Sequence, residues 1–176
     1  CIHMYDTARW MLDLGWPARV YSSGGIRVRP ANGPNISDTQ TAVFEHDGLD
    51  LVWTHRAWGA PVDPKYPWAI TVYGDKGTLK AGVMSYDFIP QDGNQPSIHK
   101  DAVIEREQYP EDLQEKDIEL FAAAAMRAHM KNFVDAIATR GRPVADIAQG
   151  YISSAACILA NLSMKLDRAL AWDPAR

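Results

Sequence analysis

The sequence predicts an α+β fold in which helices pack on one face of an open, largely antiparallel β-sheet. Two observations predict it: strand-like segments separated by turn residues fill the middle of the chain, and helical periodicity brackets them at both ends. The length of 176 residues and the mass of 19.6 kDa are those of about one domain, large enough to bury a core without disulfides. We therefore expect one domain over residues 1–176.

The first expected element is a helix over about residues 3–14. Apolar side chains such as Met4 and Ala8 recur at helical spacing along it. Gly15 and Pro17 follow, as a left-handed cap and a residue that cannot continue a helix. The helix therefore ends before the strands begin.

Strand-like segments occupy the region up to about residue 107. The expected strands cover residues 18–28, 39–46, 49–58, 68–73, 78–81, 85–89 and 102–107. Asp47-Gly48 is a strong hairpin signal between the second and third strands. Gly24-Gly25 predicts a bulge or a close approach of another part of the chain. Residues 90–101 are polar and rich in Pro and Gly, which predicts a loop.

Two long amphipathic helices close the chain, over about residues 115–140 and 146–169. Gly141 and Pro143 end the first, and Asp146 is placed to cap the second. In the strands over 39–46 and 49–58, the alternation keeps aromatic side chains on one side. That side is either the core beneath the helices or, as the alternative, an interface with another subunit or domain.

Charge and composition exclude several classes of partner. There are 18 Lys and Arg against 22 Asp and Glu, so no excess of basic charge is available to neutralise nucleic-acid phosphates. We read the apolar runs as too short to span a bilayer, and two cysteines cannot make a disulfide framework or a four-ligand zinc site. We expect a cytoplasmic protein. Because the chain starts at Cys1 without an initiator Met or a leader, we expect it to be the back part of a longer chain.

Familiar cofactor and nucleophile motifs are missing from the sequence. It contains no G-x-G-x-x-G, no Walker loop, no H-E-x-x-H and no G-x-S-x-G. We therefore assign no cofactor-binding and no metal-binding residue to this chain. His46 and His55 lie on neighbouring expected strands, but such a pair is more typical of a surface or an interface than of a metal site.

His3 and Asp6 form the candidate catalytic pair. They stand three residues apart at the start of the first expected helix, so both side chains project on one side of its first turn. A helix N-terminus disfavours the imidazolium form, as a general base requires, and Asp6 is placed to orient the ring. From spacing alone, a frayed terminal histidine without a catalytic role is an equal alternative.

Four ordered strings carry a resemblance to a known family. They are His3-Met4-Tyr5-Asp6 with Trp10, the run from Ile70 to Leu79, the run from His129 to Ile137 followed by Gly141 and Pro143, and Leu166-Asp167-Arg168 with Trp172-Asp173. Together they resemble the C-terminal domain of the glucose–fructose oxidoreductase, inositol dehydrogenase and rhizopine catabolism (Gfo/Idh/MocA) family, over nearly the whole chain.

The resemblance implies a two-domain dehydrogenase in which an N-terminal Rossmann domain, absent from this chain, holds NAD or NADP. The C-terminal domain shapes a pocket for a sugar, a polyol or a related hydroxylated molecule. His3 matches the histidine of the family's Asp-x-x-x-His pair, and Asp6 matches the acidic residue three positions later. The aspartate of that pair and the lysine of the Glu-Lys-Pro motif would precede the chain. Cys1 stands where the family usually has Gly.

Two functions follow as hypotheses. The first is the substrate-binding and oligomerisation domain of an NAD- or NADP-dependent oxidoreductase, with no cofactor expected on this chain alone and no dehydrogenase activity when it is isolated. The alternative is a stand-alone, non-catalytic carbohydrate-binding or assembly module with the same fold. In either case we expect a homo-oligomer formed through the open sheet face. We expect neither a nucleic-acid nor a membrane partner.

Overall fold

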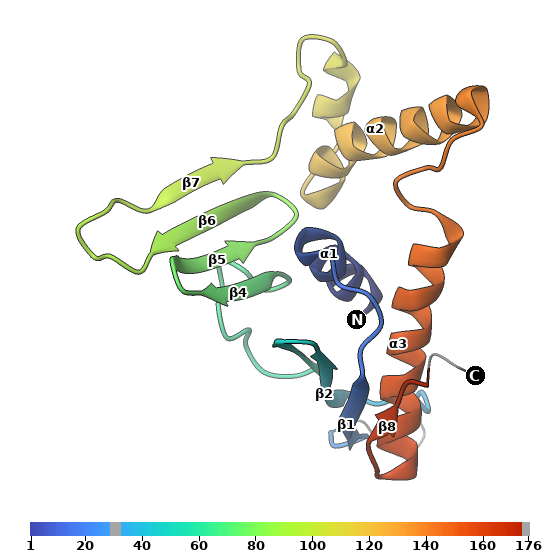
Figure 1. Ribbon diagram of the computed structural model, residues 1–176. Helices are drawn as coiled ribbons and strands as arrows, with labels where there is room; N and C mark the ends of the chain where they lie inside the picture. The colour runs from blue at the N-terminus through green and yellow to red at the C-terminus, as the bar shows by residue number, and fades with distance from the viewer. Residues whose placement is uncertain (29–32, 174–176) are drawn as a thin grey trace. The chain divides into compact units, whose positions relative to one another are not determined.

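The computed structural model describes residues 1–28 and 33–173, and its elements confirm an α+β fold (Figure 1). The helices are α1 (Ile2–Leu12), the short 3₁₀ helix η1 (Pro110–Gln114), α2 (Ile118–Thr139) and α3 (Ile147–Leu166). The strands are β1 (Arg19–Gly25), β2 (Thr39–His46), β3 (Leu49–Arg56), β4 (Ile70–Gly74), β5 (Gly77–Ala81), β6 (Ser85–Pro90), β7 (Ile98–Asp101) and β8 (Leu170–Ala171).

Hydrogen bonding divides the strands into two antiparallel sheets rather than one. Their orders are β3-β2-β1-β8 and β4-β5-β6-β7. The chain forms two compact units, the first made of Cys1–Ala60 with Ala145–Arg176 and the second of Pro61–Val144. Between β3 and β4 the sequence has three prolines, which lack the N–H that a strand ladder needs. The single sheet expected from the sequence is therefore interrupted there.

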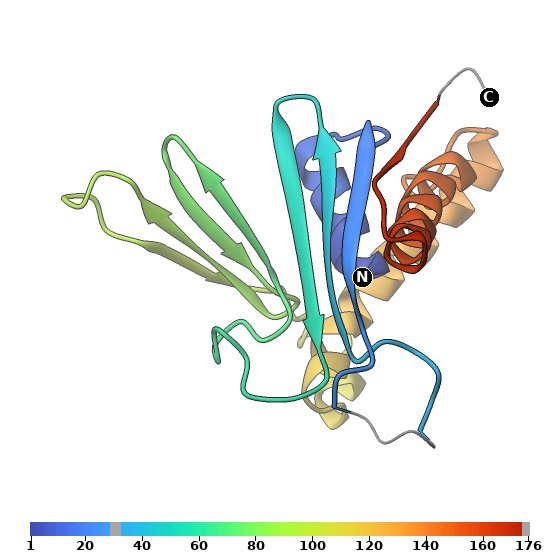
Figure 2. The same ribbon diagram turned by 90° about the horizontal axis from the view of Figure 1, so that it is seen from below.

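The core of the first unit lies between its sheet and the helices α1 and α3. Strands β1, β2 and β3 run side by side (Figure 2), and Val20, Phe44 and Leu51 form one row across them. Phe44 is fully buried against Tyr5 of α1, with ring centroids 4.3 Å apart. Trp53 packs against the same core from the same face of the sheet. The interpretation of these aromatic side chains as core beneath the helices is therefore confirmed.

Gly24 occupies a close approach between β1 and its neighbours, as its position in the sequence suggested. A Cβ at this position would lie 2.2 Å from the Thr39 carbonyl oxygen and 3.0 Å from Met164 Sδ of α3. We expect Gly24→Ala to destabilise the protein by about 2 kcal/mol or more, because backbone atoms must move to admit the methyl group. Urea unfolding measures this. Gly15→Ala, where a Cβ meets nothing within 4 Å, is the matched control and should cost little. Equal stability of the two variants would contradict the close approach.

The predicted position of the last strand in the second unit was wrong by several residues. The structure forms β7 over Ile98–Asp101, within the expected loop, whereas residues 102–107 form no strand. That segment is instead held by its side chains. Glu105 accepts hydrogen bonds from Arg127 of α2, which also binds Asp112 and places its guanidinium 3.7 Å from the centre of the Tyr109 ring. An ion-pair anchor therefore replaces the strand pairing.

Helix α3 is long and apolar enough, by length and composition, to cross a membrane. That is weak support for a membrane span, because the core helix of a soluble protein passes the same test. One stripe of α3 is buried in the first unit, where it packs on β1 and β2: Ser153, Ala156, Ala160 and Ser163. The Ser163 hydroxyl accepts the Ser22 N–H at 2.9 Å and donates to the Arg168 carbonyl at 2.7 Å. The small and polar residues of this stripe fit helix-on-sheet packing.

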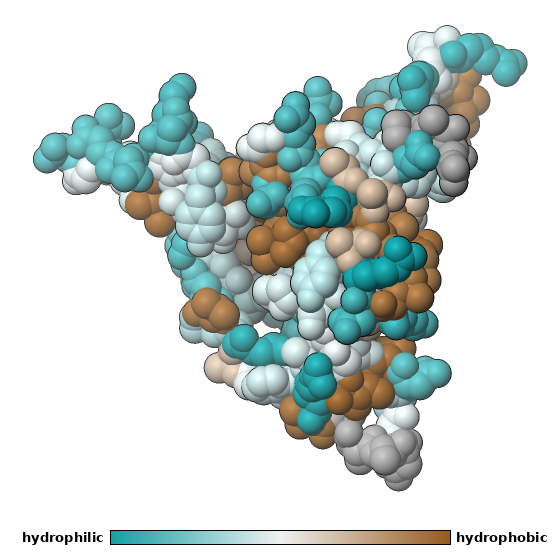
Figure 3. Space-filling model, turned by 60° about the horizontal axis from the view of Figure 1, so that its bottom comes forward, coloured by the Kyte–Doolittle hydropathy of each residue, from teal (hydrophilic) through white to brown (hydrophobic). Residues whose placement is uncertain are grey.

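Apolar side chains also remain at the surface. Figure 3 shows apolar and hydrophilic areas next to each other on one face of the protein. In α2 no described residue is buried, and about half of the side-chain surface of Met130, Phe133 and Ile137 is exposed. These three residues belong to the apolar stripe that the helical spacing predicted. The helix is thus confirmed, whereas these side chains of its apolar stripe are not buried.

Candidate functional site

The first turn of α1 carries His3. The helix begins at Ile2, and the Tyr5 N–H donates to the Cys1 carbonyl at 3.0 Å to close the turn. His3 is exposed, and its carbonyl accepts a 2.8 Å hydrogen bond from the Thr7 hydroxyl. The structure thus places the imidazole at a helix N-terminus, as the sequence predicted. Its catalytic role stays a prediction.

Asp6, which is exposed, joins α1 to α3 through a polar cluster with the buried side chains of Arg9 and Ser153. Its carboxylate accepts a 2.5 Å hydrogen bond from the Ser153 hydroxyl, and that hydroxyl accepts a 2.6 Å bond from Arg9. Arg9 is only 3% exposed and also donates to Gly15 and Gln149. Arg9 Nη1 lies 3.9 Å from the Asp6 carboxylate. The cluster therefore fixes the orientation of α1, the helix that presents His3.

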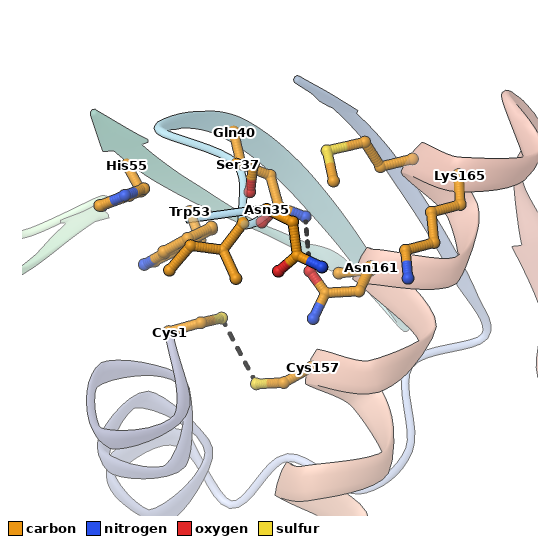
Figure 4. Close-up of a pocket in the computed structure, with 12 residues that line it drawn as sticks. Cys1, Asn35, Ser37, Gln40, Trp53, His55, Cys157, Asn161 and Lys165 are labelled. Carbon is orange, nitrogen blue, oxygen red and sulfur yellow. Dashed lines mark hydrogen bonds between the residues drawn. The ribbon is translucent and has the colours of Figure 1, made fainter. Parts of the chain in front are cut away.

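A pocket of about 450 Å³ opens in the first unit, between α1, α3, the sheet and the segment before β2 (Figure 4). Its described lining consists of Cys1, Asn35, Ile36, Ser37, Gln40, Trp53, His55, Cys157, Ala160, Asn161, Met164 and Lys165. The Trp53 and His55 rings are parallel within 6°, with centroids 5.7 Å apart. The Gln40 amide donates to Asn161 at 3.3 Å. The wall thus combines an aromatic surface with amide groups and one ammonium group, which suits a small polar ligand.

Burial controls the ionisation of Cys157, which lines this pocket, and of His46, which does not line it. It raises the pKa of the Cys157 thiol to about 11, so this sulfur is protonated at neutral pH. Burial, assisted by the Arg9 charge, lowers the pKa of His46, which favours its neutral form. The Tyr5 hydroxyl lies 3.3 Å from His46 Nε2. This histidine is therefore a hydrogen-bonding partner within the core.

The two histidines on neighbouring strands are not brought together. His46 pairs with Leu49 at one end of the β2–β3 ladder, whereas His55 pairs with Gln40 near the other end. Among the residues that the structure describes, no group of three His, Cys, Asp or Glu side chains is placed to hold a metal ion.

The second unit has a separate charged cluster on its sheet. Asp87 accepts from Lys65 at 2.6 Å and lies 2.5 Å from His99, and these two partners lower its pKa to about 2. The Asp87 carboxylate in turn raises the pKa of His99. Lys80 pairs with Asp63 at 2.7 Å. Lys65 and His99 are exposed and the other three side chains are partly exposed, so we interpret the cluster as a solvated ion-pair network.

Sequence reasoning did not identify several residues of this site. The alternation along residues 49–58 had singled out the aromatic side chains there, Trp53 among them, whereas neither Asn161 nor Lys165 was singled out. The spacing of Arg9 three residues after Asp6 is a local signal that both lie on one helix face. No local signal connects either of them with Ser153.

Comparison with known proteins supplies a family. A family model described as "Oxidoreductase family, C-terminal alpha/beta domain" matches residues 1–171. No curated protein matches the chain. Several solved structures do, and the chain spans about half the length of each one described below.

Three of these structures illustrate the match. An oxidoreductase from Agrobacterium radiobacter in complex with NAD+, L-tartaric acid and magnesium is 18% identical, with a TM-score of 0.65 over 97% of this chain and 47% of that one. An aldose-aldose oxidoreductase from Caulobacter crescentus complexed with glycerol is 12% identical, with a TM-score of 0.65 over 97% and 45%. A myo-inositol 2-dehydrogenase from Lactobacillus plantarum is 13% identical, with a TM-score of 0.58 over 98% and 47%. At these identities the likeness shows the fold alone.

Proposed function

The chain belongs to the Gfo/Idh/MocA oxidoreductase family as its C-terminal α/β domain, and from this premise we propose that it is the substrate-binding and oligomerisation domain of a cytoplasmic, NAD- or NADP-dependent oxidoreductase. The substrate class is a sugar, a polyol or a related hydroxylated small molecule. The observation that carries the proposal is the family match over residues 1–171, in a chain about half as long as its solved relatives. His3 is the general base in this proposal.

The dinucleotide belongs to a part of the protein outside this chain. A pyrophosphate needs a glycine-rich turn at a helix N-terminus, and no G-x-G-x-x-G occurs here. The Gly24-Gly25 pair does not supply one, because Gly24 abuts the backbone of β2 inside the sheet. The residues present therefore do not fit NAD or NADP, and none of them is assigned a role in binding the cofactor. NAD+ in the Agrobacterium radiobacter structure supports its use by a longer protein of this kind.

The pocket beside α1 supports a hydroxylated ligand. The face of Trp53 is suited to stack on the C–H face of a sugar or a cyclic polyol, and the Asn161 amide both donates and accepts hydrogen bonds to hydroxyl groups. Lys165 adds a cation, which favours a ligand that also carries a carboxylate. Cys1 lines the pocket two residues before His3.

Association through the open face of the first sheet is the second half of the proposal. Tyr21, Val43 and Val52 form a row across that face, and the side chains of Tyr21 and Val52 are about half exposed. The aromatic side chains of Phe44 and Trp53 lie on the opposite face, so the apolar patch here is smaller than the sequence suggested. Light scattering at micromolar concentration tests this association, and a strictly monomeric species contradicts it.

Ligand binding by the isolated chain tests the proposed pocket. We expect the isolated chain to bind a polyol such as myo-inositol with an affinity in the millimolar range, by calorimetric titration, and to reduce no NAD+. Trp53→Ala should abolish that binding. Trp10→Ala, which removes an exposed indole of α1 in the same unit, is the matched control and should preserve it.

The decisive assay uses a longer protein that contains this domain together with a dinucleotide-binding domain. Polyol-dependent reduction of NAD+ or NADP+ by that protein supports the proposal. Polyol binding without any reduction of either cofactor favours the carbohydrate-binding module, and absence of both contradicts the proposed substrate class.

A further inference from the structure

Two thiols face each other beside the pocket, although they lie 156 residues apart in the chain. The Cys157 thiol of α3 donates to Cys1 Sγ, and the two sulfur atoms are 3.4 Å apart (Figure 4). Cys1 is the N-cap of α1 and makes no side-chain capping bond. Both residues line the pocket, so a small solute that enters it reaches both sulfur atoms.

We propose that Cys1 and Cys157 form a reversible disulfide on exposure to hydrogen peroxide, as a redox modification site that ties α1 to α3. A disulfide has an S–S distance of about 2.05 Å, so the sulfurs must approach by roughly 1.4 Å. That movement is small for a residue at the very start of a helix whose side chain is exposed.

The two thiols are suited to different steps. Cys1 is exposed and is the sulfur that peroxide meets first. Cys157 is half-buried, and burial raises the pKa of its thiol to about 11, so at neutral pH it remains a thiol and is not the sulfur that peroxide oxidises first. This is the arrangement of an exposed reacting cysteine and an adjacent resolving cysteine.

The chemistry balances with peroxide as the oxidant. The Cys1 thiolate attacks one peroxide oxygen, the O–O bond breaks, and a sulfenic acid and hydroxide are formed. The Cys157 sulfur then attacks the Cys1 sulfur, the S–O bond breaks, and the Cys157 proton leaves with the hydroxyl as water. In total, two thiols and one hydrogen peroxide give one disulfide and two waters. A thiol reductant restores both thiols by exchange.

The cross-link would act on the candidate site. It joins the residue before the first turn of α1 to the middle of α3, and His3 lies in that turn. The Arg9, Ser153 and Asp6 cluster already connects the same two helices further along α1. With both connections made, α1 is held to α3 at two points, and the pocket wall between the two cysteines is closed. In a reducing cytosol such a disulfide is transient and therefore regulatory rather than structural.

The test is mass spectrometry of the purified chain, and it needs neither substrate nor cofactor. After reduction, treatment with an equimolar amount of hydrogen peroxide and alkylation, we expect a mass loss of about 2 Da with no alkylated thiol. Non-reducing trypsin digestion should then link the peptide of residues 1–9 to the peptide that contains Cys157, and dithiothreitol should separate them. Because the measurement detects a covalent bond between the two cysteines, its result is independent of the proposed oxidoreductase function.

Two variants complete the test. In Cys157→Ser we expect Cys1 to gain oxygen without an intramolecular cross-link, and in Cys1→Ser we expect Cys157 to react at least tenfold more slowly than the wild-type pair. Two alkylated thiols after peroxide treatment of the wild type would overturn the proposal. So would oxygen addition at Cys1 without the linked peptides, or a disulfide found only between two chains.

Discussion

His3→Ala is expected to lower kcat of the longer oxidoreductase by roughly 100- to 10,000-fold, because it removes the proposed general base for the substrate hydroxyl. The reason is positional: His3 is exposed in the first turn of α1, two residues after Cys1, which lines the pocket, although His3 itself is not among the lining residues. Steady-state kinetics with the polyol and NAD+ or NADP+ measure the effect. The loss should fall on kcat rather than on KM, whereas a merely structural role would change both.

His129→Ala is the matched control for His3. His129 is an exposed histidine of α2 in the second unit, and its replacement should leave kcat within about twofold. Thermal unfolding of both variants should match the wild type, because both side chains are exposed. If His3→Ala retained kcat within a factor of about three, His3 would not be the base, and the assignment carried over from the family would be wrong for this chain.

Arg9→Ala should lower the free energy of unfolding by about 3 kcal/mol. Arg9 is buried and donates to Ser153, to the side chain and carbonyl of Gln149, and to the Gly15 carbonyl. Removing the guanidinium takes a hydrogen-bond donor from the buried Ser153 hydroxyl, and it opens a cavity between α1 and α3. Urea unfolding followed by circular dichroism measures the loss. In the longer protein we expect a secondary loss of activity, because this cluster orients the helix that carries His3.

Two control variants separate the buried cluster from a general effect of charge. Arg9→Lys keeps the charge but loses the forked geometry of the guanidinium, so it should recover only part of the stability. Arg19→Ala removes an exposed arginine of β1 that pairs with Glu45 of β2, and it should change stability little. Equal losses in Arg9→Ala and Arg19→Ala would contradict the role of the buried cluster.

The strand pattern shows which features of the fold can be read from local sequence. Asp47-Gly48 predicted the turn between β2 and β3, and these strands pair from His46 with Leu49 to Thr39 with Arg56. Alternation along the same strands predicted that Phe44 and Trp53 share a face, which is the face that packs on the helices. Both features depend on residues close in sequence, because a strand alternates its side chains with a period of two.

The end of the second sheet shows where local sequence fails. Residues 102–107 have strand-like composition, yet Arg127 of α2, 22 residues away in sequence, binds Glu105, and the segment lies outside the sheet. Val103 is 76% exposed there, so it finds no apolar partner that would favour pairing. Residues 98–101 pair with β6 instead. A tertiary ion pair thus outweighs a weak local preference.

By itself the sequence determined the α+β class, the order of the helices and the first strands, the start of the helix that bears His3, and the resemblance that the family match confirms. Only the tertiary structure decided that Asp6 meets Ser153, that Cys1 meets Cys157, and that Trp53 lines a pocket with residues of α3. The physical reason is sequence separation. Helix and strand periodicity reports neighbours a few residues apart, whereas these contacts join residues more than 100 positions apart, and only the packing of α3 on α1 and the sheet brings them together.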